Sequence, residues 1–447
     1  MKQFPQWLQG LQNPVFARLY LAQTINLIGD ALTWLGLALL TFELAGAGSG
    51  TVLAVSLTLR VMAFVVLSPI AGALADRIDR RRLMITTHLA RMGIVCLLPF
   101  VTQIWQIYAI IFSLNVFHAF FTPTYTATIP LVTTKATHAQ AIALSSATYQ
   151  LLGVLGPGLA GSVAAFSGTR AVFFLDGLTF LVAAILIMTL PGQLSVSPNQ
   201  QVRTVEQTLR DIQAGTTCLW LDPQMRYALI LQFIAAIAGA EILVNTVSHI
   251  QGTLHLGKLE YSWVMAAFGI GATLASVGLG NAQQKVSKNF CIGVGAFLIT
   301  LALLPANWVS LNSLLLLWLV AGVGQTLVNV PTQTLIADRV AVDVQGRVYG
   351  AHFAWSHLWW VFTYPLAGWM GHHLSTNNFT YTSLIGQFLL IVAYLAFAPR
   401  SQAASDHGLW HDHEHTHEGQ HQHEHVGLSR SHSHLHFHHI TQQEFIH

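Results

Sequence analysis

Charged residues are scarce in this 447-residue chain: Asp, Glu, Lys and Arg make up 9% of it, whereas soluble proteins carry about 25%. Hydrophobic residues make up 53%, and the mean hydropathy is positive, at +0.53. Apolar runs of about 20 residues, long enough to cross a bilayer as helices, recur along most of the length. The formal net charge is only +2, so nothing indicates a nucleic-acid partner. The composition predicts a polytopic helical membrane protein whose partner is the lipid bilayer.

Cysteine and several diagnostic motifs are also lacking. The three cysteines, Cys96, Cys218 and Cys291, are far apart and form no Cys-x-x-Cys pair, so no disulfide framework is indicated. No Gly-x-x-x-x-Gly-Lys-[Ser/Thr] motif for nucleotide phosphates occurs. The first twenty residues lack the short apolar core and small-residue cleavage site of a signal peptide. We therefore expect no enzyme and no resident cofactor, and an N-terminus that leads directly into the first spanning helix.

Twelve apolar stretches are predicted to span the membrane as helices. A long polar connection at 191–225 divides them into an N-terminal six-helix half, 1–190, and a C-terminal six-helix half, 226–399. A polar tail follows at 400–447. The predicted spans are 17–41, 51–75, 83–102, 105–131, 141–166, 171–190, 226–250, 261–281, 289–306, 311–336, 348–370 and 380–398.

The positive charges indicate how this topology is oriented. Of the twenty Lys and Arg residues, sixteen fall on one side of the predicted membrane. Only Arg170 and Lys258 fall on the other side, while Arg60 and Arg91 fall inside spans. Loops rich in Lys and Arg stay in the cytoplasm. Both termini are therefore predicted to be cytoplasmic.

The two halves repeat one another. Shifting the first half by 208 residues places prolines on prolines, a threonine on a threonine and a glycine on a glycine. The pairs are Pro123 with Pro331, Thr124 with Thr332, Pro157 with Pro365, and Gly72 with Gly280. A parallel repeat of this kind predicts two halves of the same architecture.

A dense charge cluster lies between the second and third spans, where it marks a tight turn at the membrane face. It resembles the loop between the second and third helices of major facilitator superfamily transporters, although Asp79 stands where that family usually has glycine. The resemblance implies the twelve-helix major facilitator fold and a role for this loop in alternating access. The matching residues are Gly72, Asp76, Arg77, Arg80 and Arg81.

The fifth span carries a second family resemblance. Gly153, Gly156, Pro157 and Gly161 are similar to the glycine-proline motif of antiporters in this superfamily, mainly exporters. Small residues let helices approach closely, and proline leaves one backbone carbonyl unpaired. The alternative is that these residues serve helix packing alone.

Polar residues inside the spans are the candidates for a substrate or proton pathway. Asn26 and Asp30 lie four residues apart on the first span, with Gln23 one turn earlier, so they share a face. Asp30 falls near the middle of the membrane. The alternative for Asp30 is a structural ion pair with Arg60 of the second span.

Two further polar faces occur in later spans. Glu241, Asn245 and His249 repeat every four residues on the seventh span, and Asn115 and His118 share a face of the fourth. A carboxylate, an amide and an imidazole suit a transition metal or a proton. The alternative is a polar stripe without a ligand role. Asp176 of the sixth span, expected to pack outside the cavity, is predicted to be structural.

The tail is rich in histidine, with fourteen in its last 48 residues. It cannot bury a core, so it is expected to be disordered without metal. Neutral imidazoles suit Ni²⁺, Cu²⁺, Zn²⁺ and Co²⁺. The candidate metal ligands are His411, His413, His415, His417, His421, His423, His425, His432, His434, His436, His438 and His439.

A transporter body with such a tail resembles the nickel-resistance permeases of bacteria. The resemblance implies an exporter of Ni²⁺ or Co²⁺ in the bacterial inner membrane, and we expect a monomer that is driven by proton antiport. Energy coupling is needed because two positive charges leaving against the membrane potential cost about 4.6 kcal/mol per 100 mV. The alternatives are a drug, macrolide or siderophore exporter with an apolar, aromatic cavity, and a metal sensor or storage protein that uses only the tail.

Overall fold

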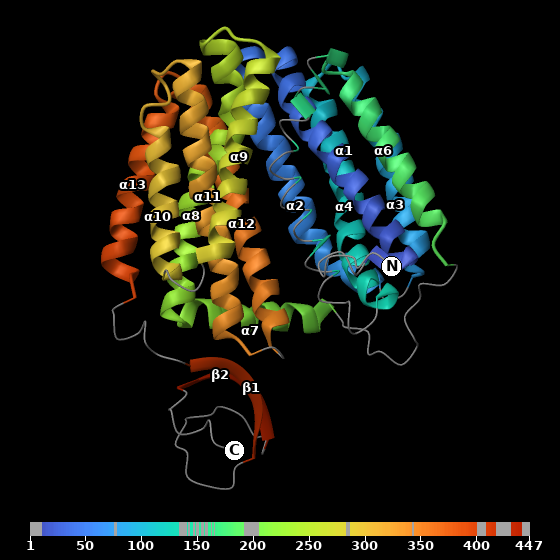
Figure 1. Ribbon diagram of the computed structural model, residues 1–447, viewed down its shortest axis with the longest axis vertical. Helices are drawn as coiled ribbons and strands as arrows, with labels where there is room; N and C mark the ends of the chain where they lie inside the picture. Colours follow the sequence, from blue (N-terminus) through green and yellow to red (C-terminus); the bar gives the residue numbers. More distant parts are fainter. Residues whose placement is uncertain are drawn as a thin grey trace.

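The structure is a computed structural model in which helices dominate the described part of the chain (Figure 1). The described residues are 11–75, 78–133, 141, 144–145, 148, 152, 156, 160–161, 163–164, 166–191, 205–282, 287–341, 344–399, 408–416 and 431–439.

The N-terminal half contains long helices that follow the predicted spans. Its described helices are α1 (Pro14–Ala45), α2 (Ser49–Ala75), α3 (Arg80–Val95), α4 (Ile104–Val132) and α6 (Ala171–Met188), with short 3₁₀ turns η2 (Gly46–Gly48) and η3 (Leu98–Phe100). Where the fifth span was predicted, the described residues between 141 and 167 are also helical.

The C-terminal half begins after a helix that the span prediction did not include. Its described elements are α7 (Val205–Leu221), α8 (Pro223–Ser248), the π-helical turn η4 (His249–Thr253), α9 (Lys258–Ala282), α10 (Lys288–Leu303), α11 (Leu311–Arg339), α12 (Gln345–His373) and α13 (Asn378–Phe397). The connection predicted at 191–225 thus carries α7, an amphipathic helix that packs against α12 and also contacts α2 and α8.

The first helices of the two halves begin in the same way. Asn13 caps α1 by accepting hydrogen bonds from the amides of Val15 (2.9 Å) and Phe16 (3.3 Å), and Pro14 follows it. Asp222 caps α8 by accepting from the amides of Gln224 (2.9 Å) and Met225 (3.0 Å), and a proline again follows. A capping side chain satisfies amides that the helix leaves free, and proline tolerates the first helical position. The shared start supports the internal repeat.

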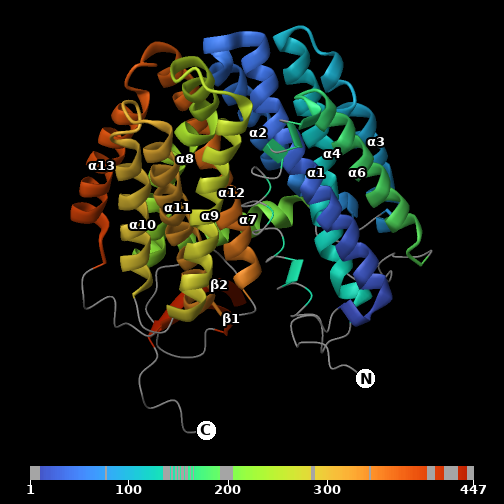
Figure 2. The same ribbon diagram turned by 45° about the horizontal axis from the view of Figure 1, so that its top comes forward.

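The two halves lie side by side and meet along α2 and α12 (Figures 1 and 2). Helices α3 and α6 lie on the outer side of the N-terminal half, and α10 and α13 on the outer side of the C-terminal half. Figure 1 shows the halves spread apart toward the end that carries α7 and the strands. A cavity lies between α1, α2, α4 and the C-terminal half, whose residues line it.

Glycines set the close packing within the C-terminal half. A Cβ atom built on Gly322 of α11 would lie 1.8 Å from the carbonyl oxygen of Phe268 in α9, and one built on Gly271 would lie 1.9 Å from that of Leu319. Any side chain at these two positions would force the helices apart.

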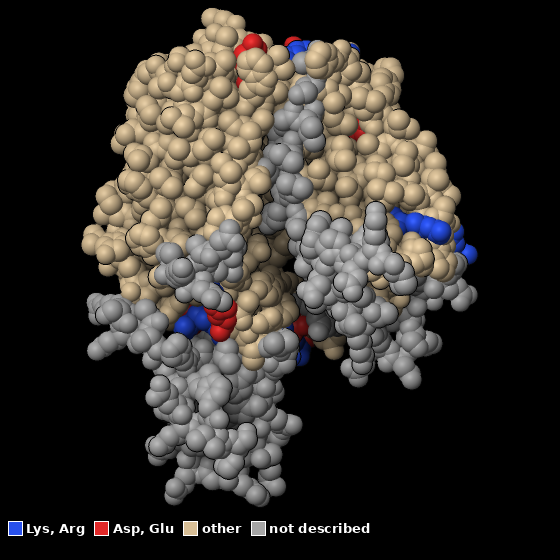
Figure 3. Space-filling view, viewed as in Figure 1, with Lys and Arg blue, Asp and Glu red and all other residues tan. Residues whose placement is uncertain are grey.

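The surface matches a membrane protein. Figure 3 shows the described charged residues mostly toward the two ends of the molecule, with a broad uncharged belt between them. Eight stretches of the described chain are long and apolar enough to cross a membrane, and α10 is a shorter apolar helix. Large apolar side chains such as Phe166, Leu395 and Phe388 are exposed on the described helices. The finding fits an all-helical body that spans the bilayer.

The tail departs from the expectation of disorder in two segments. Strands β1 (Gly408–Thr416) and β2 (Ser431–His439) pair in antiparallel fashion. Histidine recurs at every second position in both segments, and a period of two is that of a β-strand. The prediction treated this alternation only as ligand and spacer, and so missed the strands.

Candidate functional site

A central cavity of about 290 Å³ lies between the two halves. Its lining is mostly apolar and aromatic, and the polar side chains that reach it are few. The lining residues are Leu27, Asp30, Ala31, Trp34, Leu35, Ala38, Leu53, Leu57, Arg60, His118, Leu152, Leu243, Tyr261, Met265 and Tyr364. Small-molecule sites have this character, with an apolar wall and a few placed polar groups.

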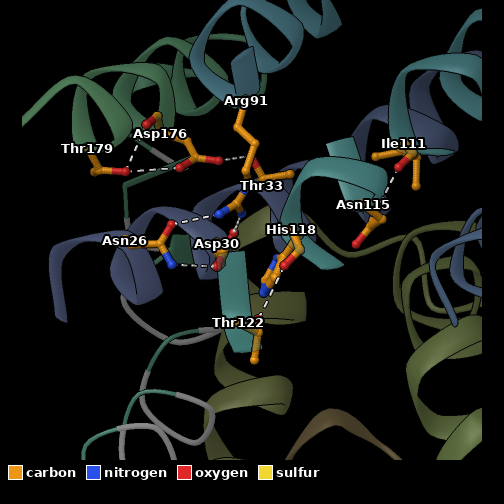
Figure 4. A network of polar contacts seen from close by, with 10 residues as sticks. All are labelled: Asn26, Asp30, Thr33, Arg91, Ile111, Asn115, His118, Thr122, Asp176 and Thr179. Atoms are coloured by element: carbon orange, nitrogen blue, oxygen red, sulfur yellow. Dashed lines mark hydrogen bonds and ion pairs between the residues drawn. The ribbon is translucent and has the colours of Figure 1, made fainter. Parts of the chain in front are cut away.

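Asp30 lines this cavity, but its ion-pair partner is Arg91 and not Arg60, the arginine considered from the sequence. Its Oδ1 forms an ion pair with Arg91 Nη2, and its Oδ2 accepts from Asn26 Nδ2 at 3.2 Å (Figure 4). Arg91 Nη1 also donates to Asn26 Oδ1 at 2.9 Å. The suggested Asp30–Arg60 pair is therefore wrong, because α3 brings Arg91 to the face of α1 that carries Asp30.

Arg91 is the residue that the sequence reasoning missed. It is fully buried, and its guanidinium lies 4.1 Å from the centroid of the Phe180 ring, so it joins α1, α3 and α6. A buried charge requires a partner. The signal was present in the sequence, since Arg60 and Arg91 were the only two basic residues well inside the predicted spans, away from their ends.

Asp176 belongs to the same polar network. It is fully buried on α6, where its Oδ2 accepts from Thr33 Oγ1 at 2.5 Å and its Oδ1 accepts from Thr179 Oγ1 at 3.0 Å (Figure 4). It does not line the cavity. Asp176 thus helps to hold α6 against α1, which fits the structural role expected for it.

Glu241 and Asn245 lie in a separate buried site in the C-terminal half. Glu241 Oε1 accepts from Asn245 Nδ2 at 2.8 Å and from Asn378 Nδ2 at 2.7 Å. Among the described residues, no donor meets hydrogen-bond geometry with its Oε2, and none forms an ion pair with Glu241. Neither Glu241 nor Asn245 lines the cavity. The structure therefore does not bring this pair to Asp30 in one ligand set.

Asn245 reaches from this site to the contact between the halves. Its Nδ2 also donates to the carbonyl of Ala367 in α12 at 2.8 Å. Cβ atoms built on Gly50 of α2 and Gly371 of α12 would lie 2.4 and 2.0 Å from Asn245 Oδ1. The two glycines therefore make room for this amide where the halves pack together.

The histidines of the spans are dispersed. His118 lines the cavity, with its ring 5.1 Å from that of Phe64. His249 packs against Phe379 at 5.4 Å, and His352 shares a hydrogen bond of 2.9 Å with Gln232. Asn115, on the face of α4 with His118, donates to its own helix, to the carbonyl of Ile111, at 2.8 Å. Only His118 of these residues reaches the cavity.

At the end of α1 a small polar cluster joins the two halves. Lys258 Nζ of α9 lies 2.5 Å from Glu43 Oε1 of α1, and it donates to Thr169 Oγ1 at 2.7 Å. Thr169 donates in turn to Glu43 Oε1 at 2.7 Å. Thr51 of α2 donates to the carbonyl of Gly368 at 3.3 Å nearby in the α2–α12 contact. These contacts hold the halves together at the end opposite α7.

The two family motifs are described only in part. Asp76, Arg77, Gly153 and Pro157 lie outside the described residues, and Gly72 lies near the end of α2. Arg81 donates to the last carbonyls of α6, to Ile187 at 3.3 Å and to Met188. Arg80 at the start of α3 is buried. Cations are favoured at a helix C-terminus, so Arg81 fastens α3 to α6.

The described glycines of the fifth span lie at close helix contacts. A Cβ atom on Gly156 would lie 2.5 Å from the Cβ of Ala31 in α1, and one on Gly161 would lie 1.8 Å from Ser262 Oγ in α9. Gly161 thus permits a contact between the two halves. Helix packing accounts for both residues.

Among the described residues, no three His, Cys, Asp or Glu side chains lie together as a metal site would require. The side chains of the tail are not among those described. The tail histidines 417, 421, 423 and 425 lie outside the described part. In β1 and β2, three pairs of histidines occupy opposite register positions: His411 with His436, His413 with His434, and His415 with His432.

Known bacterial proteins resemble this chain over most of its length. An uncharacterized MFS-type transporter, YfiS, of Bacillus subtilis is 26% identical over 342 residues, covering 74% of this chain and 80% of that protein. The multidrug efflux pump Tap of Mycolicibacterium fortuitum is 24% identical over 406 residues, covering 87% and 96%. Macrolide efflux protein A of Streptococcus pyogenes is 23% identical over 285 residues, covering 61% and 68%.

Solved transporters share the fold. A bacterial homolog of the human lysosomal transporter Spinster, in an inward-facing and unoccupied conformation, superposes with a TM-score of 0.66 at 14% identity, covering 87% of this chain and 98% of that one. The nucleoside transporter NupG superposes with a TM-score of 0.67 at 13% identity, covering 86% and 100%. The model of the Major Facilitator Superfamily matches residues 19–244 and 228–418. The structure has the two packed helical halves and the central cavity of such a transporter. The chain therefore belongs to the Major Facilitator Superfamily and is a membrane transporter.

Proposed function

We propose that this protein exports amphipathic organic compounds from the bacterial cytoplasm across the inner membrane. The observation that carries the proposal is the lining of the central cavity, where, among the described residues, leucines, Trp34, Tyr261 and Tyr364 surround Asp30, Arg60 and His118. Similarity to macrolide and multidrug efflux proteins supports the same substrate class. The family and fold favour transport rather than catalysis.

The cavity is poorly suited to a bare divalent metal. Such ions need several oxygen, nitrogen or sulfur ligands that converge on one point. In the cavity, Asp30 has both oxygens engaged by Arg91 and Asn26, and Arg60 adds a positive charge that repels cations. Glu241 and Asn245, the other proposed ligands, lie in a separate buried site. The organic substrate is therefore the better fit to the described residues.

Proton antiport is the proposed energy source. Glu241 has no cationic partner among the described residues, and an uncompensated buried charge is costly, so a proton is the simplest neutralising ion. The amide of Asn245 bonds to Glu241 and also lies where α2 packs against α12. A change of charge on Glu241 would therefore reach the end of the molecule opposite α7, where the halves are held together. The halves would then rock about the cavity, as expected for two parallel repeats. The termini are proposed to lie in the cytoplasm, and the protein to act as a monomer.

Export of Ni²⁺ or Co²⁺ is the second candidate function, and the tail is the observation that favours it. Histidines occupy three pairs of opposite register positions in β1 and β2, and imidazole is a good ligand for both metals. A tail that binds metal would raise its local concentration beside the transporter. The tail would supply metal to the body, although the described body offers no converging ligand set.

Survival of a bacterial host that lacks its own efflux pumps tests both functions. The host would express the full chain, a chain ending at residue 400, or an empty vector, and would be challenged with erythromycin, ethidium, an aromatic acid, Ni²⁺ and Co²⁺. If the protein exports organic compounds, both the full chain and the shortened chain should give resistance to at least one of them. Neither chain should raise resistance to Ni²⁺ or Co²⁺. Resistance confined to Ni²⁺ or Co²⁺ would contradict it and support the second candidate.

A further inference from the structure

Arg60 of α2 is a cation in the central cavity with no ion-pair partner among the described residues. Its Cζ atom lies 4.2 Å from the centroid of the Trp34 ring. Among the described residues no hydrogen bond or ion pair of Arg60 occurs, and both oxygens of the acid that shares the cavity, Asp30, are engaged elsewhere. Arg60 therefore keeps its hydrogen-bonding groups free for a ligand.

A guanidinium that lies over an indole can still bind an anion. The ring stabilises the positive charge, and the five N–H donors lie in the plane of the guanidinium, where they form a fork. Carboxylate, sulfonate and phosphate groups match this fork with two parallel hydrogen bonds. A cavity walled by leucines excludes much of the water that would otherwise weaken such a contact.

The surroundings of Arg60 define the rest of the ligand. Leu53 and Leu57 of α2 lie on the preceding turns, and Leu243, Met265 and Tyr364 line the cavity from the C-terminal half. The charge of Asp30 is compensated by Arg91, so it does not cancel that of Arg60. A molecule that satisfied the whole cavity would have an apolar or aromatic body and a single anionic group.

We propose that the substrates are amphipathic organic anions and that Arg60 selects them by binding their carboxylate, sulfonate or phosphate group. This inference rests on the proposed export of organic compounds and names the substrate class for it. Trp34 acts as the positioning residue, since its ring holds the guanidinium. The apolar lining binds the body of the molecule, and Arg60 distinguishes an acid from a neutral or cationic molecule of the same shape.

Three probes with one ring system test this selectivity. The full chain, purified in a neutral detergent, would be titrated calorimetrically with 2-naphthoate, 2-naphthamide and 2-naphthylmethylammonium, with detergent alone as the blank. The acid should bind about ten- to a hundredfold more tightly than the amide, because a hydrogen bond to a charged group is added. The ammonium probe should bind more weakly than the amide.

Variants assign the preference to Arg60. Arg60→Gln should remove the advantage of the acid while keeping the affinity for the amide within about threefold, and Arg60→Lys should retain part of the advantage, since lysine keeps the charge but not the fork. Arg18→Gln is the matched control, because Arg18 lies outside the cavity and donates to the carbonyl of Thr189. Gel filtration and thermal unfolding would confirm that each variant is folded.

Each result decides between the two proposals. Equal binding of the three probes, or preference for the ammonium probe, would overturn the anion proposal and leave organic export intact. An acid preference that persists in Arg60→Gln would overturn the role of Arg60. If none of the three bound to the full chain, the anion proposal would fail, and the survival test with erythromycin and ethidium would still decide the proposed function. If Arg60→Gln did not fold, Arg60→Lys and the probe series on the unmodified chain would still decide.

Discussion

The two halves of this transporter share a fold, but two of their buried carboxylates, Asp30 and Glu241, have opposite surroundings. In the N-terminal half, Asp30 is paired with Arg91, and α1, α3 and α6 are joined through that arginine. In the C-terminal half, Glu241 is surrounded by the amides of Asn245 and Asn378 without a cation among the described residues. A paired charge stabilises one arrangement of helices, whereas an unpaired carboxylate can respond to a proton. The two repeats therefore differ in how these two carboxylates are held.

Removing the arginine of the N-terminal half should have the largest effect. Arg91→Met leaves Asp30 buried against Asn26 without its cation, so folding should lose about 3–5 kcal/mol, as for other broken buried pairs. The yield of monodisperse protein and its thermal unfolding would measure this. Combining Arg91→Met with Asp30→Asn should recover most of the loss. A single variant as stable as the parent would contradict the comparison between the halves.

Neutralising the buried carboxylate of the C-terminal half, Glu241, should affect transport rather than folding. Glu241→Gln keeps the shape and an oxygen for Asn245 and Asn378, so stability should change by less than about 1 kcal/mol. Because glutamine does not exchange a proton, export should no longer follow an imposed pH gradient. Vesicle transport at several gradients, with Gln232→Glu as a carboxylate placed elsewhere on α8, would check this. Unchanged gradient dependence would remove Glu241 from the coupling path.

Disrupting the contact between the halves at Lys258 should cost far less folding free energy than removing Arg91. Lys258 and Glu43 are both partly exposed, so Lys258→Gln should cost only about 0–1 kcal/mol of stability. It should nevertheless open the end at Thr169 more often. Spin labels on α1 and α9, in a background without Cys96, Cys218 and Cys291, would report a second, longer distance. A single unchanged distance would show that this cluster does not hold the halves together.

The tail lies outside both halves, and its removal should have the smallest effect on organic export. A chain ending at residue 400 should transport organic substrates at rates within about twofold, because the cavity uses none of the tail. The full chain should bind Ni²⁺ at pH 7.5 and lose it as the pH falls below about 6.5, since protons compete for imidazole. Calorimetric titration would check binding. Equal nickel binding by the shortened chain would contradict the assignment to the tail.

Sequence reasoning located the helices well, because the length and apolarity of a span are local properties. Predicted spans such as 51–75 and 311–336 correspond to Ser49–Ala75 and Leu311–Arg339. Helix α7 was missed, since it is amphipathic and too polar to be read as a span. The tail strands were missed because their alternation was attributed to ligand spacing.

The candidate site was harder to predict because it depends on which helices are neighbours in space. The residues Asn26 and Asp30 were correctly expected on one face, but their partner Arg91 comes from α3. Glu241 and Asn245 were also expected to share a face, yet Asn378 of α13 and the glycines of α2 and α12 enclose them away from the cavity. Periodicity along one helix does not reveal these contacts.

Transport by everted membrane vesicles tests the central claim most directly. Vesicles carrying the chain that ends at residue 400 would be energised, and uptake of 2-naphthoate, erythromycin, ethidium and radioactive nickel would be compared with vesicles without the protein. Export through the cavity predicts energy-dependent accumulation of at least one organic compound, abolished by a proton uncoupler, and no accumulation of nickel. Nickel uptake without uptake of any organic compound would contradict the account.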